Sequence, residues 1–295
     1  MNTPVRWKDE YFVSEKRVVL TEEQLEIPGL RVFGHHSMST ASEPLVLHFH
    51  ENAYEFMMIT EGAFSLQMAG KNYKVSGGDV FVTPPGEIHS TNQMPLSLGE
   101  FYWFQLDISY IKDLLFLSEE AAADLLRRLQ EVISQVIHTD NKDLKKVIKK
   151  AFTLTVSREN RYMTAGYLVI FLNMMIEYSR KETTTLTRDI ESALNYIMDM
   201  FTQEITLEEL ADHCNLSVSQ FKQKFKSQVG VSPRCYINQQ KVEYAKSLLL
   251  EGKSKTDIAM QLGFSSSSYF AAVFKKFTSC TPSEYVNVLL VQEEL

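Results

Sequence analysis

The chain has 295 residues, with 30 Lys and Arg against 37 Asp and Glu, and so a formal net charge of −7. Hydrophobic residues make up 44% and charged residues 23%, which is a globular composition and excludes disordered and low-complexity classes. The acidic balance excludes a non-specific polycation that coats nucleic acid. It still permits local basic patches, because net charge averages over domains. A chain of this length predicts two domains.

The cysteines and the hydropathy pattern indicate the compartment. Cys214, Cys235 and Cys280 form no C-x-x-C pair, and an odd number fits no closed disulfide framework, so we expect reduced thiols. The first ten residues are charged without an apolar core, so we expect no signal peptide. The most apolar helix candidate, residues 162–178, is interrupted at Asn173, short of the roughly 20 residues that span a bilayer. These patterns predict a cytoplasmic protein with no membrane partner.

The first part of the chain, to about residue 106, reads as short strands. Residues 45–50 are extended and β-rich, and 55–60 and 64–68 follow as short apolar segments. Turn sequences such as Pro84-Pro85-Gly86 separate them. This spacing predicts an all-β sandwich or barrel at about residues 20–106.

From about residue 108 the apolar residues recur at helical spacing. The predicted helices are residues 119–137, 142–156 and 163–180. One stripe of the first helix comprises Leu125, Leu129, Val132, Ile133 and Val136. The stripe has two interpretations, packing against its own domain or a dimer seam. A polar stretch at 181–185 predicts an interdomain linker.

The last hundred residues contain an internal repeat. Side chains of the first copy recur 49 positions later: Phe221, Phe225, Lys226, Ser232, Pro233 and Tyr236 correspond to Phe270, Phe274, Lys275, Thr281, Pro282 and Tyr285. Thr206 with Glu209, and Ser217 with Gln220, are capping boxes that open two successive helices. Asn215 between them suits the left-handed residue that ends a helix. The repeated unit is therefore a helix, a short turn and a helix.

This unit has the layout of a helix-turn-helix whose second helix enters the DNA major groove. Five basic residues and no acidic one lie between His213 and Val242, which is a local footprint for phosphate in an acidic chain. The alternative is a small helical bundle with a solvated polar face. The expected DNA contacts are Ser217, Ser219, Gln220, Lys222, Gln223 and Lys226 in the first copy, and Ser266, Ser267, Ser268, Lys275 and Lys276 in the second.

Residues 188–286 resemble the DNA-binding domain of the AraC/XylS family of transcription regulators. The matching motifs are Thr206-Leu207-Glu208-Glu209-Leu210-Ala211, Gly230-Val231-Ser232-Pro233 with Tyr236, Ala245 with Leu248-Leu249, Ile258-Ala259, Gly263-Phe264, Tyr269-Phe270, Phe274-Lys275-Lys276, and Thr281-Pro282 with Tyr285. The resemblance implies two helix-turn-helix units joined by a long helix at about 233–250. Their recognition helices, about 217–228 and 266–277, would enter successive major grooves roughly one helical turn apart.

The sequence departs from the family pattern at several positions. Ser279 stands where Gly is usual, Val286 where Arg usually closes the domain, and Lys241 where Arg is usual. Ala271-Ala272 lie where the second recognition helix often offers an Arg to a base. We therefore expect the first unit to supply most of the sequence discrimination and the second to anchor the domain.

The β half carries a histidine pattern. It reads His48-x-His50-x4-Glu55-x6-Gly62, then Gly78-x5-Pro84-x-Gly86-x2-His89. This resembles the two motifs of the cupin superfamily, a small β-barrel. In metal-binding cupins the three His and the Glu converge on a divalent metal, and three imidazoles with a carboxylate suit Zn, Fe, Mn, Ni or Cu.

The other interpretation places these residues in an effector pocket. With the aromatic residues nearby, the predicted effector-binding set is His48, His50, Tyr54, Glu55, His89 and Trp103. We expect no cofactor, with a divalent metal at His48, His50, Glu55 and His89 as the alternative. Phe81 and Phe104 are expected in the barrel core. Tyr102 and Phe104 alternate with Trp103, and the sequence leaves open which face is inward.

These patterns predict an α+β two-domain chain, with a cupin-like β-barrel and appended helices at 1–181, a linker at 182–188 and an all-α tandem helix-turn-helix at 189–295. The predicted function is a sequence-specific transcription regulator, an activator controlled by a carbohydrate or related metabolite. Its expected partners are double-stranded DNA, the effector, a second copy of the chain and RNA polymerase. Two alternatives stay open: a metal-dependent cupin enzyme, an oxygenase or isomerase, fused to a DNA-binding module, and an effector-free regulator whose barrel is a dimerisation scaffold.

Overall fold

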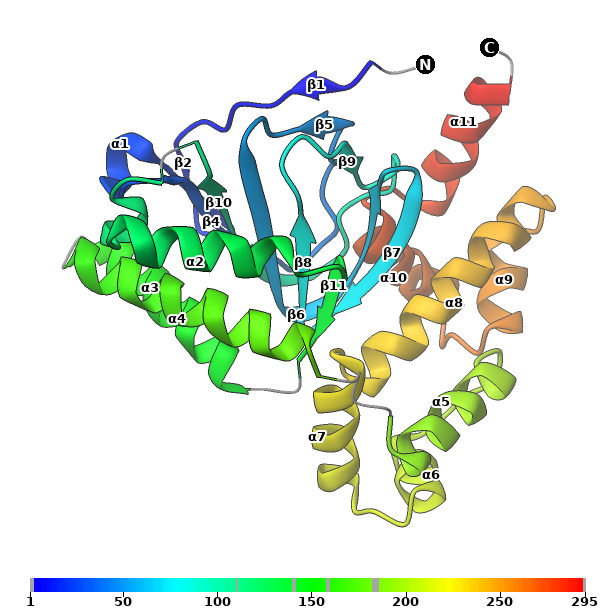
Figure 1. The fold of residues 1–295 in the computed structure, drawn as a ribbon. Coiled ribbons are helices and arrows are strands. Elements are labelled where there is room, and N and C mark those ends of the chain that lie inside the picture. Colours follow the sequence, from blue (N-terminus) through cyan, green and yellow to red (C-terminus); the bar gives the residue numbers. More distant parts are fainter. Residues whose placement is uncertain (1–2, 110, 140–141, 158–159, 182–185, 294–295) are drawn as a thin grey trace. The chain divides into compact units, whose positions relative to one another are not determined.

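A computed structural model describes residues 3–109, 111–139, 142–157, 160–181 and 186–293 (Figure 1). Contacts between Cα atoms divide the chain into two compact units. The first comprises Met1–Met38 with Pro44–Thr184, and the second comprises Ser39–Glu43 with Thr185–Leu295. The first unit is a curled β-sheet with helices, and the second is helical, so the predicted fold class is confirmed.

The strands of the first unit form one curled sheet. They are β1 (Val5–Arg6), β2 (Phe12–Val13), β3 (Arg17–Thr21), β4 (Leu30–Met38), β5 (His48–Phe49), β6 (Ala53–Met68), β7 (Lys71–Ser76), β8 (Asp79–Thr83), β9 (His89–Ser90), β10 (Gly99–Asp107) and β11 (Val136–His138). Their order is β1-β5-β9-β6-β10-β4-β3-β2, with β7 and β8 also on β6 and β11 on β8.

The long strand β6 curls the sheet. Its first half pairs with β10 and β8, and its second half pairs with β7 and β9. Gly62 lies between the two halves at φ +98°, and a Cβ there would lie 2.5 Å from the Leu98 carbonyl oxygen. Only glycine has both this backbone conformation and this close approach without strain.

The two faces of the sheet have separate cores. Phe101 and Trp103 of β10 lie inside the barrel with Phe81, whereas Tyr102 and Phe104 belong to the core shared with the helices. The inward-facing residue is therefore Trp103, and Tyr102 and Phe104 face the other side of the sheet. This answers the question that the sequence left open. Phe81 is in the barrel core as expected. Phe104 packs against the helical layer instead.

The helical layer contains α1 (Glu22–Leu25), the 3₁₀ turn η1 (Leu114–Phe116), α2 (Glu119–Gln130), α3 (Lys142–Ser157) and α4 (Arg161–Ser179). Figure 1 shows α2, α3 and α4 along one side of the sheet. The predicted helix 119–137 is wrong beyond Gln130, because residues 136–138 form β11 on the edge of β8. There the Gln135 carbonyl accepts the Val82 N–H at 2.8 Å, so the backbone pairs with the sheet.

The predicted stripe on α2 is therefore not continuous. Leu125 and Leu129 are buried in the core of their own unit, while Ile133 lies beyond the helix and is 87% exposed. His138 lies on β11, and its Nδ1 pairs with Asp79 Oδ1 at 2.8 Å.

The second unit contains α5 (Arg188–Met200), α6 (Leu207–His213), α7 (Val218–Val229), α8 (Pro233–Leu250), α9 (Lys255–Gln261), α10 (Ser267–Thr278) and α11 (Pro282–Glu293). Both predicted capping boxes are present, at Thr206 with Glu209 and at Ser217 with Gln220. Asn215 has φ +54°, as expected between the two helices. The predicted recognition helices and the long connecting helix are therefore α7, α10 and α8. Among the described helices, none is long and apolar enough to cross a bilayer.

Candidate functional site

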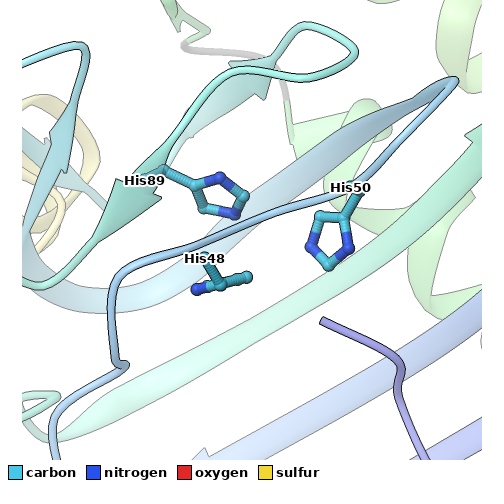
Figure 2. A group of neighbouring side chains, drawn as sticks. All are labelled: His48, His50 and His89. Carbon is cyan, nitrogen blue, oxygen red and sulfur yellow. The ribbon is translucent and has the colours of Figure 1, made fainter. Parts of the chain in front are cut away.

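Three histidines meet inside the barrel. β5 pairs with β9 so that His48 lies directly opposite His89, and His50 follows on the same side of the chain two residues later. One ring nitrogen from each of the three lies within 4.8 Å of the others (Figure 2). All three side chains are buried, with 4–6% exposure.

Glu55 and Gln105 lie against this histidine cluster, which comprises His48, His50 and His89. Glu55 Oε2 lies 3.2 Å from His50 Nε2, and Glu55 Oε1 lies 3.5 Å from His89 Nε2. Gln105 is the direct neighbour of Glu55 across β10 and β6, and its Nε2 donates to Glu55 Oε2 at 3.1 Å. Two of the three imidazoles therefore contact one buried carboxylate, with an amide that holds the carboxylate in position.

Backbone carbonyls set the orientation of two rings. His48 Nδ1 lies 2.7 Å from the Val46 carbonyl oxygen, and His89 Nδ1 lies 3.0 Å from the Glu87 carbonyl oxygen. Because a carbonyl only accepts, each Nδ1 carries the hydrogen. The Nε2 atom of His89 then faces Glu55 Oε1, and the Nε2 atom of His48 can accept a proton or bind a ligand.

The pKa values of His48 and His89 are shifted in opposite directions. Burial opposes the charge of Glu55, but hydrogen bonds from His50 and His89 outweigh it and hold the pKa of Glu55 well below its usual value. Burial also opposes the charge of His89, yet Glu55 raises its pKa. His48 differs: burial and the neighbouring His89 lower its pKa to about 4. The cluster thus pairs an ionised Glu55 with a proton on its histidine side.

A cavity of about 60 Å³ adjoins the cluster. His48, His50, Glu55 and Trp103 are among the residues that line it. The other lining residues are Trp7, Asp9, Arg17, His36, Leu45, Val46, Met57, Leu96 and Phe101. Mostly apolar walls around a few convergent polar groups are the usual form of a small-molecule site.

The N-terminal segment contributes to this cavity. β1 pairs in parallel with β5, and the Trp7 ring centroid lies 5.6 Å from that of His48. Asp9 Oδ2 accepts from Gln105 Nε2 at 2.9 Å, so one amide links Asp9 to Glu55. Burial, and then the charge of Glu55, raise the pKa of Asp9.

The donor set fits a divalent transition metal. The histidine cluster and Glu55 offer nitrogen and carboxylate ligands, and the two carbonyl-bound Nδ1 atoms are the outer contacts that orient ligating imidazoles. A bound ion would supply a fixed positive charge beside Glu55.

The structure brings together His48, His50, Glu55, His89 and Trp103 of the predicted pocket. It does not bring Tyr54 to them: Tyr54 precedes Glu55 on β6, and successive residues of a strand face opposite sides of a sheet. Its ring packs in the core shared with the helices, 5.8 Å from that of Phe56.

Sequence reasoning missed four contributors to the site: Trp7, Asp9, His36 and Gln105. His36 lies on β4, an interior strand between β10 and β3 in the sheet. Strand alternation could have predicted Gln105, because it follows Trp103 by two residues and so faces the same side of β10. The N-terminal segment carries no such local signal.

The outer face of α7 is polar. Ser219, Lys222, Gln223 and Lys226 are exposed. The other two predicted contacts are engaged in the capping box: Gln220 Oε1 accepts from the Ser217 hydroxyl at 2.9 Å and from its backbone N–H at 3.1 Å. α7 therefore presents two lysines, a serine and a glutamine to a partner.

The outer face of α10 is less varied. Ser268, Lys275 and Lys276 are exposed, Ser267 is half-buried, and Ser266 caps the helix by accepting the Tyr269 N–H at 3.1 Å. Sequence reasoning missed Tyr269 as a surface residue: its side chain is 50% exposed at the start of the helix.

Comparisons with known proteins agree with this division of the chain. A helix-turn-helix domain model matches residues 210–287, and a cupin domain model matches residues 39–95. The thermoregulatory protein LcrF of Yersinia pestis is 25% identical over 254 residues, covering 81% of this chain and 90% of LcrF. The lactose operon transcription activator of Staphylococcus xylosus is 24% identical over 239 residues, covering 77% of this chain and 81% of the activator.

Among solved structures, ToxT of Vibrio cholerae, bound to (E)-4-(8-methylnaphthalen-1-yl)but-3-enoic acid, covers 93% of this chain and 100% of its own, with 18% identity and a TM-score of 0.34. A tandem helix-turn-helix in one chain with a cupin-type barrel defines a transcription regulator that binds double-stranded DNA. In both matched domains and in its relatives, the chain resembles the AraC/XylS family of transcription regulators. The related proteins are transcription regulators, so the hypothesis of a fused cupin oxygenase or isomerase is not favoured.

Proposed function

We propose that the chain is a cytoplasmic, homodimeric transcription activator whose DNA binding is controlled by a small polar effector in the barrel cavity. The observation that carries the proposal is the buried histidine cluster with Glu55, beside a cavity that combines polar and apolar lining residues. The proposed effector is a carbohydrate or a related metabolite.

The cost of this cluster argues against a barrel that serves only as a scaffold. Placing a carboxylate and imidazoles out of water is unfavourable unless they are paired, and apolar residues of similar volume are often as stable or more so. Glu55 is 7% exposed and His36 is 8% exposed in this interior. A ligand that binds these polar groups explains why they are buried although they add no net stability.

The size of the cavity constrains how an effector enters. The volume of about 60 Å³ is far below the roughly 300–1,000 Å³ of ordinary ligand pockets, so a sugar requires a rearrangement. Trp7 and Asp9 line both this cavity and a larger surface hollow of about 670 Å³. Displacing residues 5–11 would therefore join the two spaces. In this mechanism the effector replaces the contacts of Trp7 and Asp9 with the barrel.

A divalent transition metal is the second candidate effector. The orientation of the His48 and His89 rings, each with Nδ1 on a backbone carbonyl, favours it. A metal needs no enlargement of the cavity.

The DNA contacts proposed for α7 are Ser217, Ser219, Gln220, Lys222, Gln223 and Lys226, and those for α10 are Ser266, Ser267, Ser268, Lys275 and Lys276. The lysines would bind phosphate, and Gln223 would read a base edge. We place dimerisation on α4, where the apolar Tyr162, Met163 and Ile170 are 46–60% exposed. Activation would proceed through contact with RNA polymerase, and the name of the Staphylococcus xylosus activator supports this direction of control.

The test is a thermal-shift screen of the full chain against sugars, other metabolites and divalent metals, with and without a chelator. An effector at 100 times its Kd should add about 2.7 kcal/mol of stability. We expect the shift to be lost in Glu55→Gln and kept in Glu61→Gln, the same change at an exposed position of the same strand. A hit that persists in Glu55→Gln, or the absence of any hit, would contradict the proposal. A hit abolished by chelator identifies the metal.

A further inference from the structure

The two helix-turn-helix units have separate apolar cores on one shared helix. In the described residues, Ile237 of α8 packs in the first core with Phe221 and Phe225. Val242, Ala245, Leu248 and Leu249 of α8 pack in the second core with Phe270 and Phe274. The two clusters have no residue in common. The angle between the units therefore depends on what lies at the boundary between Ile237 and Val242.

Lys241 lies at this boundary and is buried, with 5% exposure. Its Nζ donates to the Gln203 carbonyl oxygen at 3.1 Å, in the loop between α5 and α6 of the first helix-turn-helix unit. The same Nζ lies 5.3 Å from the ring centroid of Phe264, in the turn between α9 and α10 of the second helix-turn-helix unit. One ammonium group thus contacts both units at once.

The backbones of these two loops also meet. Gly263 has φ +63°, and a Cβ on it would lie 3.2 Å from the carbonyl carbon of Gln203 and 3.2 Å from the nitrogen of Glu204. Lys241 is therefore seated where the two loops already touch. Burial of the ammonium lowers the pKa of Lys241, while the charge of Glu204 raises it.

We propose that Lys241 is a positioning residue that fixes the angle between the recognition helices α7 and α10, and thereby the spacing of the two DNA segments that one chain reads. A lysine that left water without these contacts would be unfavourable, because a buried charge must be paired. Only one relative arrangement of the units provides both the Gln203 carbonyl and the Phe264 ring. This role concerns the geometry of DNA reading and does not depend on the effector.

The first test measures the angle without DNA. Spin labels on Gln223→Cys of α7 and Ala272→Cys of α10, with the native cysteines replaced and unlabelled protein in excess, report the distance between the recognition helices within one chain. We expect Lys241→Met, which keeps the length of the side chain, to broaden the distance distribution at least about twofold. Lys241→Arg should restore the narrow distribution. Lys246→Met is the matched control, because Lys246 pairs with Glu243 of its own helix.

The second test measures the spacing of DNA sites. The probe is a duplex that the wild-type chain enriches from a random-sequence pool, and a derivative with one base pair inserted between the two contacted segments. One base pair rotates and displaces the second segment by roughly 35° and 3.4 Å. We expect the insertion to weaken wild-type binding at least about tenfold and Lys241→Met binding less than about threefold.

Gly263→Ala is an independent variant, because its Cβ would push the two loops apart while Lys241 stays. It should displace the mean distance between the labels. Circular dichroism and the melting temperature verify that each variant is folded. An unchanged distance distribution together with an unchanged spacing penalty in folded Lys241→Met would overturn the proposal.

Discussion

Gly34 on β4 should be intolerant of a single added methyl group. It lies opposite Trp103 across β4 and β10, and its Cβ would lie 2.2 Å from Trp103 Nε1 and 2.4 Å from Cε2. Real Cβ atoms do not approach so closely, so the indole must move. Trp103 is 6% exposed and packed in the barrel core, which leaves it little room to move.

Overpacking of this kind costs about 1–3 kcal/mol. For a unit of this size, about 2–4 °C of melting temperature is lost per kcal/mol, so Gly34→Ala should lower the transition of the first unit by roughly 2–12 °C. Differential scanning calorimetry measures this directly, and the transition of the second unit is an internal reference. Because Trp103 lines the cavity, its displacement should also weaken effector binding.

Two variants make the reasoning refutable. Gly166→Ala on α4 is the matched control: outside its own helix backbone and chain neighbours, no atom of the described residues lies within 4 Å of its Cβ. It should therefore stabilise the helix by about 0.5–1 kcal/mol. Trp103→Phe in the Gly34→Ala background removes the indole atoms that clash and should recover stability relative to Gly34→Ala alone. A Gly34→Ala chain that melts with the wild type would refute this account of the barrel wall.

Further predictions concern the caps, the pH dependence and the DNA-binding face. Thr206→Ala removes the side chain that accepts the N–H at position N3 of α6 and should cost about 0.5–2 kcal/mol in chemical denaturation. The hydrogen bond to Asp79 raises the pKa of His138, so the pair stabilises the fold below the unfolded pKa near 6.5 and loses this effect as pH rises through the folded pKa. His138→Gln should flatten that part of the stability–pH profile, by less than about 1 kcal/mol since the ring is half-exposed. Lys222→Ala should weaken binding to all duplexes alike and reduce the salt slope by about one, whereas Gln223→Ala should change base preference at one position by about 1–3 kcal/mol. Equal base-preference profiles for the two variants would contradict this division of roles.

Local signals predicted the DNA-binding unit well. Capping boxes at Thr206 and Ser217 depend on residues three positions apart, and the structure contains both. The repeat spacing located α7 and α10 to within one or two residues. Such features follow from short-range hydrogen bonds and helical periodicity, which a single sequence displays.

Long-range pairing limited the prediction of the barrel. The helix expected at 119–137 loses its last part because residues 136–138 find a partner strand in β8, some 55 residues earlier in the chain. His36 carries no local signal of its place in the barrel, because its pairing partner Phe101 lies far along the sequence. Tyr54 and Trp103 were both predicted in the pocket because they lie near the histidine pattern in the sequence. Strand alternation places them on opposite faces of the sheet.

The central claim is that the cavity and the DNA-binding face are coupled. The most direct measurement is the Kd of the effector from the screen with and without bound duplex, alongside the Kd of the duplex with and without effector. The account predicts that both Kd values change by the same factor, because coupling between two sites is reciprocal, and that Glu55→Gln abolishes the effect of the effector on the duplex. A duplex Kd unchanged by saturating effector would contradict it.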